Sequence, residues 1–232
     1  MSVGAYHLWI IDVEGWTIER RPDSFMALLK HRHKKLSDER LMELIQRSNT
    51  SAFDELYERY SRRLLLYFFR ELGGNEEKAQ DFLQDIFLKI VEKPGLFDTE
   101  RRFSTWVFTV AYNMCKNEYR RLEVRESAQN VLIADAASDD CEGEYRHPEK
   151  NVDQKRFERA LSAELETFDD GHRSAFLLRY QQNLSMKEIG EVLGCPEGTV
   201  KSRLFHTTKK LASKLRAFNP YETEVPTNEK IK

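Results

Sequence analysis

The chain has 232 residues, of which 40% are hydrophobic and 33% charged, and its formal net charge at neutral pH is −2. This composition is typical of helical proteins with solvated surfaces and compact cores. No apolar run approaches the roughly 18 residues that a membrane span needs. Asp12 and Glu14 interrupt the apolar stretch near the N-terminus, which excludes a secretory signal, so we expect a cytoplasmic protein.

Cysteines and histidines do not form a recognisable metal or disulfide pattern. Cys115, Cys141 and Cys195 are scattered and odd in number, which argues against a disulfide framework or a zinc cluster. His31 and His33 lie in a basic run without a nearby carboxylate or thiol, so a solvated tail explains them better than a metal site. We therefore expect neither a metal nor a cofactor.

Charge is distributed unevenly along the chain. Basic residues gather in two stretches, 101–125 and 197–216, and an acidic stretch, 135–149, separates them. Two basic stretches divided by an acidic one are a stronger indication of function than the net charge.

The first predicted domain covers residues 37–125, after an N-terminal extension, residues 1–36, to which we assign no fold. Ser37 is expected to cap a short helix. Apolar residues then recur at helical spacing up to Leu72, and Gly73-Gly74 should end that second helix.

Two further helices complete this domain. Asn75 can cap the first of them, which is expected to end before Pro94. A loop over residues 94–102 leads to the other, from about Ser104 to Arg121. Its inner stripe is expected to be Val107, Val110, Ala111 and Met114.

Residues 126–152 are polar and acidic and predict a flexible linker. A second helical domain is expected over residues 153–217, and a disordered tail over 218–232. No segment predicts a strand. The fold class is therefore all-α, with two small helical domains joined by a flexible acidic linker.

The second domain contains the strongest motif, a predicted helix-turn-helix. Ser185 and Glu188 form a capping box for its first helix. Gly190 is small where the helices must cross, Gly194 permits a left-handed turn, and Val200 can fill the corner between the helices.

Polar and basic residues of the second motif helix stand where a recognition helix meets base edges and phosphates. These candidates for binding duplex DNA are Thr199, Lys201, Ser202, Arg203, His206, Lys209 and Lys210. The alternative is an ordinary helical hairpin with a solvated basic face. The motif alone would equally suit the output domain of a response regulator.

The last helix of the first domain carries a stripe suited to unpaired bases, with an aromatic ring, amides and cations at helical spacing. The stripe comprises Trp106, Thr109, Asn113, Lys116, Asn117 and Arg120, and Arg101 and Arg102 precede it. The alternative is that Trp106 belongs to the core and the remaining residues face water.

A second stripe lies on the preceding helix and comprises Asp81, Gln84, Asp85 and Leu88. It could dock on a basic partner surface or simply face water.

Four motifs in succession resemble the signatures of extracytoplasmic-function (ECF) sigma factors, the two-domain members of the sigma-seventy superfamily. They are Asp81–Phe87, Phe103–Trp106, Ala111–Asn113 and Gly198–Leu204. The resemblance covers residues 37–217 in family order. It departs from the family at His206 and Thr208, where arginine is frequent, and at the N-terminal extension.

The resemblance implies a promoter-recognition factor with core RNA polymerase and promoter DNA as partners and, where one exists, an anti-sigma factor. The stripe from Asp81 to Leu88 would contact the clamp of the polymerase largest subunit. Loop residues 96–102 would receive a base flipped from the minus-ten element, and Asn113 and Asn117 would hold the unpaired strand. The second domain would bind the minus-thirty-five duplex, and the linker would follow the RNA exit path.

Three alternatives remain open at this stage. A conventional helix-turn-helix repressor or activator gives the first domain no reason to carry the Asp81–Leu88 stripe. A sigma mimic that only sequesters an anti-sigma factor gives no reason to retain the DNA-binding candidates Asn113, Asn117, Lys201 and Arg203. An enzyme is disfavoured because the sequence shows no phosphate-binding loop, catalytic triad or metal constellation, and we expect no small-molecule substrate.

Overall fold

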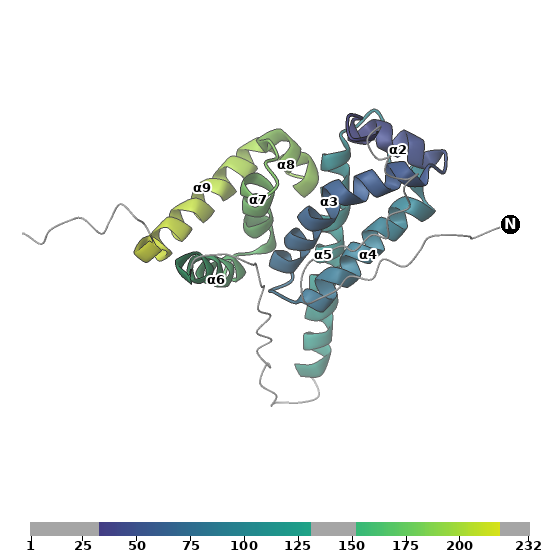
Figure 1. The fold of residues 1–232 in the computed structure, drawn as a ribbon. Coiled ribbons are helices and arrows are strands. Elements are labelled where there is room, and N and C mark those ends of the chain that lie inside the picture. Colours follow the sequence, from purple (N-terminus) through teal and green to yellow (C-terminus); the bar gives the residue numbers. More distant parts are fainter. Residues whose placement is uncertain (1–32, 131–151, 219–232) are drawn as a thin grey trace, which may run out of the picture.

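The computed structural model describes residues 33–130 and 152–218, and for 126–130 and 152–155 it describes the backbone alone. Regular structure in these two ranges is helical, and neither range contains a strand, so the predicted all-α class is confirmed. None of the helices in these ranges has the length and apolarity needed to cross a membrane. Figure 1 shows the helices in two groups, α2 to α5 and α6 to α9.

The first group has two helices that begin at their predicted caps, Ser37 and Asn75. Its members are α2 (Asp38–Gln46), α3 (Thr50–Glu71), α4 (Glu76–Glu92) and α5 (Phe103–Asn130), with a short 3-10 turn, η1 (Pro94–Leu96), before α5. The side chains of Ser37, Asn49 and Asn75 each accept a backbone N–H at the start of a helix. Gly73 and Gly74 follow α3 with φ of 63° and 78°, a conformation that glycine adopts without a Cβ clash.

Aromatic rings join α3 to α5 in the core of this group. Tyr60 meets Phe103 edge to face with ring centroids 4.9 Å apart, and Tyr67 meets Phe108 in the same way at 5.5 Å. All four side chains are at most 2% exposed. Burying an apolar side chain of this size contributes about 1.5–3 kcal/mol, so these contacts hold α5 firmly in place.

The predicted helix-turn-helix is confirmed in the second group. This group comprises α6 (Val152–Glu166), α7 (Asp170–Tyr180), α8 (Met186–Leu193) and α9 (Glu197–Lys214), followed by η2 (Arg216–Phe218). Ser185 and Glu188 make both hydrogen bonds of the capping box, and Gly194 ends α8 with φ of 64°. Val200 is fully buried at the corner between α8 and α9.

Helix α5 is longer than predicted. It continues to Asn130, so residues 126–130, expected in the linker, are helical. Residues 122–128 include good helix formers and no glycine or proline, which explains why the helix does not stop near Arg121. Val152, the last residue of the expected linker, begins α6, and Phe218, the first residue of the expected tail, ends a 3-10 turn. The other linker residues (131–151), the N-terminal extension up to residue 32 and the tail from residue 219 lie outside the described residues.

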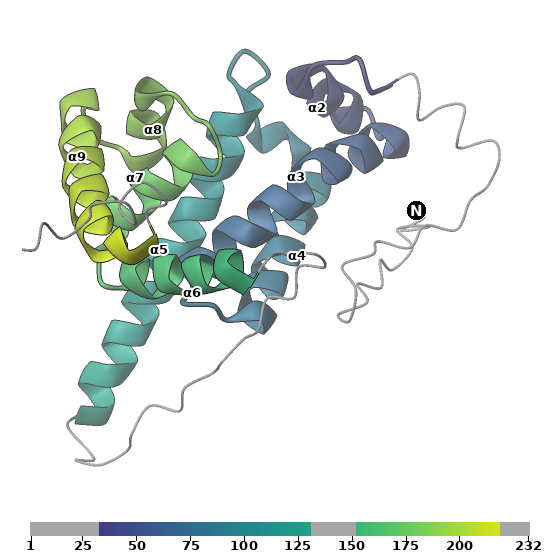
Figure 2. The ribbon, with the colours of Figure 1, turned by 60° about the vertical axis from the view of Figure 1, so that its left-hand side comes forward.

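The two groups pack against each other, which the sequence did not predict. Helix α8 packs against α5, and α7 contacts α3. Figures 1 and 2 both show α7 and α8 beside α5. As a result α5 is buried on a second side, where Tyr112 and Cys115 are at most 8% exposed.

Candidate functional site

The predicted stripe of α4 is open to solvent. Asp81, Gln84, Asp85 and Leu88 are all exposed, and the apolar side chain of Leu88 is 54% exposed. An exposed leucine among carboxylates offers both an apolar contact and charges for a basic partner. The structure therefore brings these four residues together on one accessible face.

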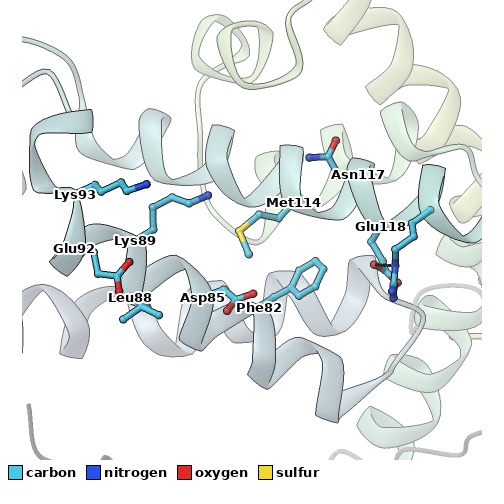
Figure 3. A pocket seen from close by; sticks show the side chains of 10 residues that line it. Phe82, Asp85, Leu88, Lys89, Glu92, Lys93, Met114, Asn117 and Glu118 are labelled. Carbon is cyan, nitrogen blue, oxygen red and sulfur yellow. Dashed lines mark hydrogen bonds and ion pairs between the residues drawn. The ribbon is translucent and has the colours of Figure 1, made fainter.

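A groove between α4 and α5 adjoins this stripe (Figure 3). Phe82 from α4 and Met114 from α5 give it apolar lining, and Asp85 and Lys89 give it charged lining. The groove belongs to both helices, so a partner that fills it would contact the α4 stripe and the α5 stripe together.

Glu118 ties α5 to α4 at one end of this groove. Its carboxylate accepts hydrogen bonds from Arg121 at 2.8 and 2.9 Å and pairs with Lys78 of α4. The hydrogen bonds from Arg121, with the contribution of Lys78, outweigh burial and lower the pKa of Glu118. Glu118 is thus held as a carboxylate that fixes the spacing of the two helices.

Trp106 has features of both alternatives that the sequence left open, a core residue and a member of an accessible stripe. Its ring is half-buried, with centroids 5.3 Å from Phe97 and 5.6 Å from Phe103. Thr109 donates its hydroxyl hydrogen bond to the carbonyl of Thr105 at 2.8 Å. The ring is anchored in the core and still presents part of its surface to solvent.

The rest of the α5 stripe is accessible. Asn113, Asn117 and Arg120 are exposed. The Lys116 amine lies 5.8 Å from the ring centroid of Tyr112 and is partly covered. Two amides and two cations therefore share one side of α5 beyond Trp106.

The two arginines before α5 differ in their partners. Arg101 is strongly exposed and forms a long, weak ion pair with Asp98 at 3.6 Å. Arg102 is also exposed but reaches the second group of helices, where it pairs with Glu188 at 2.8 Å. Burial opposes the ionised form of Glu188, but hydrogen bonds from Ser185 and Arg102 lower its pKa. Arg102 thus joins the end of the loop to α8.

The predicted recognition stripe of α9 is mostly exposed. Its exposed members are Lys201, Ser202, His206, Lys209 and Lys210, and Thr199 is half-buried. Lys201 pairs with Glu197 at 3.1 Å, but both side chains are at least half exposed, so DNA phosphates could displace that pair. The exposed members of this face are thus accessible to a duplex.

Two members of this stripe are engaged within their own domain. The guanidinium carbon of Arg203 lies 2.7 Å from where a Cβ on Gly171 would stand, and its Nη1 donates to Sγ of Cys195 at 3.7 Å. Lys210 lies over the ring of Phe168, 4.4 Å from its centroid. Arg203 would therefore have to leave Gly171 in order to reach a base edge.

A buried polar cluster, which the sequence analysis missed, joins α3 to α7. Glu71 accepts hydrogen bonds from Arg173 Nε at 3.1 Å and from the Ser174 hydroxyl at 2.5 Å. The Tyr119 hydroxyl donates to the backbone carbonyl of Glu71 and accepts from Arg173 at 2.8 Å. The one sequence signal was that Glu71 follows Tyr67 by one helical turn, on a side of α3 where charge is unusual.

Burial sets the electrostatics of this cluster. The side chains of Glu71 and Arg173 are 1% and 8% exposed. Burial raises the pKa of Glu71 even though Arg173 opposes that shift. The cost of removing both charges from water therefore offsets much of the attraction between Glu71 and Arg173.

Within the described ranges no group of three or more histidine, cysteine, aspartate or glutamate side chains could hold a metal ion. His33 is buried near the Ser51 hydroxyl at 3.5 Å. His31 and Cys141 lie outside the described residues.

The fold and its surfaces define a class, the helical factors that combine a helix-turn-helix with a second helical domain. Comparison with known families makes this specific. The Sigma-70 region 2 model matches residues 56–125, and the Sigma-70, region 4 model matches residues 159–211. The two matches together cover more than half of the chain, which belongs to the sigma-70 family as an ECF member.

Similar proteins support this assignment. The chain is 27% identical over 186 residues to the ECF RNA polymerase sigma-E factor of Haemophilus influenzae, covering 79% of this chain and 97% of the relative. It is 29% identical over 182 residues to the RNA polymerase sigma-H factor of Pseudomonas aeruginosa, covering 77% and 94%. Among solved structures, CnrH in complex with the cytosolic domain of CnrY has the same fold, with a TM-score of 0.57, 24% identity and coverage of 78% and 97%.

Proposed function

We propose that this chain binds core RNA polymerase, directs it to specific promoters and assists promoter melting. The observation that carries the proposal is the order of the two matched regions, with an accessible docking stripe in the first and a helix-turn-helix in the second. Action on the polymerase implies a cytoplasmic protein, and the proposal includes no catalytic step by the chain itself.

The first domain would have two tasks. Asp81, Gln84 and Asp85, with Leu88 as the apolar contact, would bind the polymerase. The α5 stripe, with Arg101 and Arg102, would hold the unpaired minus-ten strand. The half-buried Trp106 ring supports this role, because an anchored aromatic face with open surface is suited to base stacking.

The second domain would bind the minus-thirty-five duplex with α9. The exposed cations Lys201 and Lys209 would contact phosphates, and Ser202 and Arg203 would approach base edges. The same chain would contact both the minus-ten strand and the minus-thirty-five duplex. Once the polymerase fixes the distance between the two domains, binding of one DNA element makes binding of the other an intramolecular step. Melting would then be driven by binding energy, since trapped bases offset the unstacking that strand opening requires.

An anti-sigma factor is a further proposed partner. CnrH was solved with the cytosolic domain of CnrY, and the sigma factor RpoE of Bartonella quintana with the anti-sigma factor NepR. The exposed α4 stripe and the adjoining groove offer such a partner an accessible surface on this chain.

Run-off transcription with core polymerase and genomic fragments tests the proposal. We expect promoter-specific transcripts that require the chain. A repressor or activator would instead need another sigma factor to be present, and a mimic would leave the polymerase inactive at every fragment. Nucleotide hydrolysis by the purified chain would favour the enzyme alternative.

A further inference from the structure

Helix α2 holds the turn that leads into α5 by hydrogen bonds to the backbone. It contacts both η1 and α5. The side-chain amide of Gln46 donates to the carbonyl oxygen of Pro94 at 3.1 Å and to that of Phe97 at 3.2 Å. An amide nitrogen carries two hydrogens, so one group can make both bonds. Gln46 therefore ties the two ends of a turn in which Leu96 is 57% exposed.

Glu39, about two helical turns before Gln46, holds the start of α5. Its carboxylate accepts a hydrogen bond from the backbone N–H of Phe103 at 3.0 Å. The first N–H groups of a helix have no partner within the helix, and the helix dipole favours a negative charge beside them. Burial opposes the ionised form of Glu39, but the hydrogen bond from Phe103 and the charge of Arg102 lower its pKa. Helix α2 thus supplies a cap for α5 from another part of the chain.

The two residues that α2 holds by their backbone are those that support the Trp106 ring. The rings of Phe97 and Phe103 meet edge to face with centroids 5.4 Å apart, and the Trp106 centroid lies 5.3 and 5.6 Å from them. Phe97 and Phe103 are at most 2% exposed, whereas Trp106 is half-buried. A ring that is already fixed in its binding orientation loses less conformational entropy when a ligand binds. The contacts of α2 therefore reach an accessible ring through one residue on each side of it.

These hydrogen bonds are separate from the contacts that attach α2 to the domain. Leu41 and Met42 are fully buried and Ile45 is 6% exposed, so the apolar face of α2 packs into the core without help from its polar residues. Glu39 and Gln46 also precede residue 56, where the match to the Sigma-70 region 2 model begins. Their contacts with the turn therefore point to a role beyond anchoring α2.

We propose that Glu39 and Gln46 are positioning residues for the unpaired DNA strand. By holding the backbone at Phe97 and Phe103, they keep the Trp106 ring in the orientation that base stacking requires. The positioning itself rests on the contacts of α2 alone. Its effect on DNA affinity rests on the proposed function, because it concerns the base-binding role of Trp106.

Fluorescence of Trp106 in the full-length free chain tests the contact of Gln46. Trp9→Phe and Trp16→Phe leave Trp106 as the one tryptophan, and this chain is the reference. The carboxylate of Gln46→Glu cannot donate to the carbonyls of the turn, so we expect acrylamide to quench Trp106 at least about twofold more efficiently. Unchanged quenching would overturn the role of Gln46.

Hydrogen exchange of the Phe103 amide, followed by NMR, tests the contact of Glu39. Exchange should be at least about tenfold faster in Glu39→Ala, because the amide loses its acceptor. Glu39→Gln keeps an oxygen acceptor and should protect this amide better than Glu39→Ala does. Exchange that stays as in the reference in Glu39→Ala would overturn the role of Glu39.

Glu43→Gln is the matched control for both measurements. Glu43 lies one turn beyond Glu39 on the same helix and pairs with Arg40, so its substitution should change neither the quenching nor the exchange. Far-UV circular dichroism checks that the helices persist in each variant. Gln46 is exposed, so Gln46→Glu carries the test if Glu39→Ala fails to fold.

Binding of a single-stranded minus-ten oligonucleotide by the polymerase complex tests the functional consequence. We expect Glu39→Ala to lower the affinity by at least about fivefold and Gln46→Glu by about threefold, because hydrogen bonds that orient the ring are lost. Glu43→Gln should bind as the reference does, and every variant should keep its affinity for core polymerase.

Faster exchange or stronger quenching with unchanged oligonucleotide affinity would overturn the role of Glu39 and Gln46 in DNA binding. If the reference complex binds no oligonucleotide, that role and the proposed function fail together. Quenching and exchange need neither polymerase nor DNA, so they decide the positioning of the turn in either case.

Discussion

The carbonyl oxygen of Cys195 lies 2.8 Å from the place where a Cβ on Gly190 would stand. The turn of the helix-turn-helix therefore passes so closely over α8 that a side chain there must displace backbone. We expect Gly190→Ala to destabilise the second domain by about 1–3 kcal/mol, although alanine is the better helix former. Denaturant unfolding followed by circular dichroism measures this effect.

Gly198→Ala is the matched control for Gly190→Ala. No atom lies within 4 Å of a Cβ at Gly198, so this variant should be as stable as the wild type or slightly more stable. Equal unfolding midpoints for Gly190→Ala and Gly198→Ala would show that the close approach has no energetic consequence.

Lys201→Ala should weaken duplex binding by a similar factor on every sequence, because the exposed amine of Lys201 is suited to a phosphate. The slope of log affinity against log salt should become less steep by about 1. Anisotropy titrations of the polymerase complex at several salt concentrations measure this slope. Arg156→Ala removes an exposed cation of α6 and should leave the slope unchanged, and an equal effect of both substitutions would contradict a specific role for α9.

Asn113→Ala should reduce the affinity of the polymerase complex for a single-stranded minus-ten oligonucleotide by about tenfold, because the exposed amide is placed to bind a base edge. Duplex binding by the second domain should not change. Val124→Ala, a substitution at an exposed position farther along α5, is the control. If the oligonucleotide binds Asn113→Ala as tightly as the wild type, the α5 stripe has been assigned the wrong role.

Glu118→Gln should lower the unfolding free energy of the first domain by about 1.5–3 kcal/mol near neutral pH, because charge-assisted hydrogen bonds with Arg121 and Lys78 are lost. The pKa of Glu118 is lowered in the folded protein, so its contribution is present above the ordinary value of 4.5 and is lost as the pH falls through the folded pKa. The difference between wild type and variant should therefore shrink below pH 4.5. A difference independent of pH would exclude ionised Glu118 as the cause.

Local signals in the sequence were sufficient to predict much of the fold. The capping residues Ser37, Asn75 and Ser185 and the glycines Gly73 and Gly194 mark their helix ends by interactions within a few residues, and the structure contains each of these features. Such signals do not depend on distant parts of the chain, which is why they can be recognised without a structure.

The domain seam could not be predicted in the same way. Glu71 and Arg173 each look like solvated helix residues in the sequence, and their burial follows only from the contact of α3 with α7. The engagement of Arg203 with Gly171 likewise depends on how α7 crosses α9. Contacts between helices that are distant in the chain leave no periodic pattern in the sequence of either helix.

Binding of the purified chain to core RNA polymerase is the most direct test of the central claim. We predict that the wild type binds with high affinity and that Asp85→Arg loses at least about tenfold in affinity, because a positive charge would replace the carboxylate that we propose to face a basic surface of the polymerase. Glu166→Arg, a charge reversal at an exposed position of α6, should bind as the wild type does. Absence of any affinity of the wild-type chain for core polymerase would contradict the account, and normal binding by Asp85→Arg would show that the α4 stripe is not the docking surface.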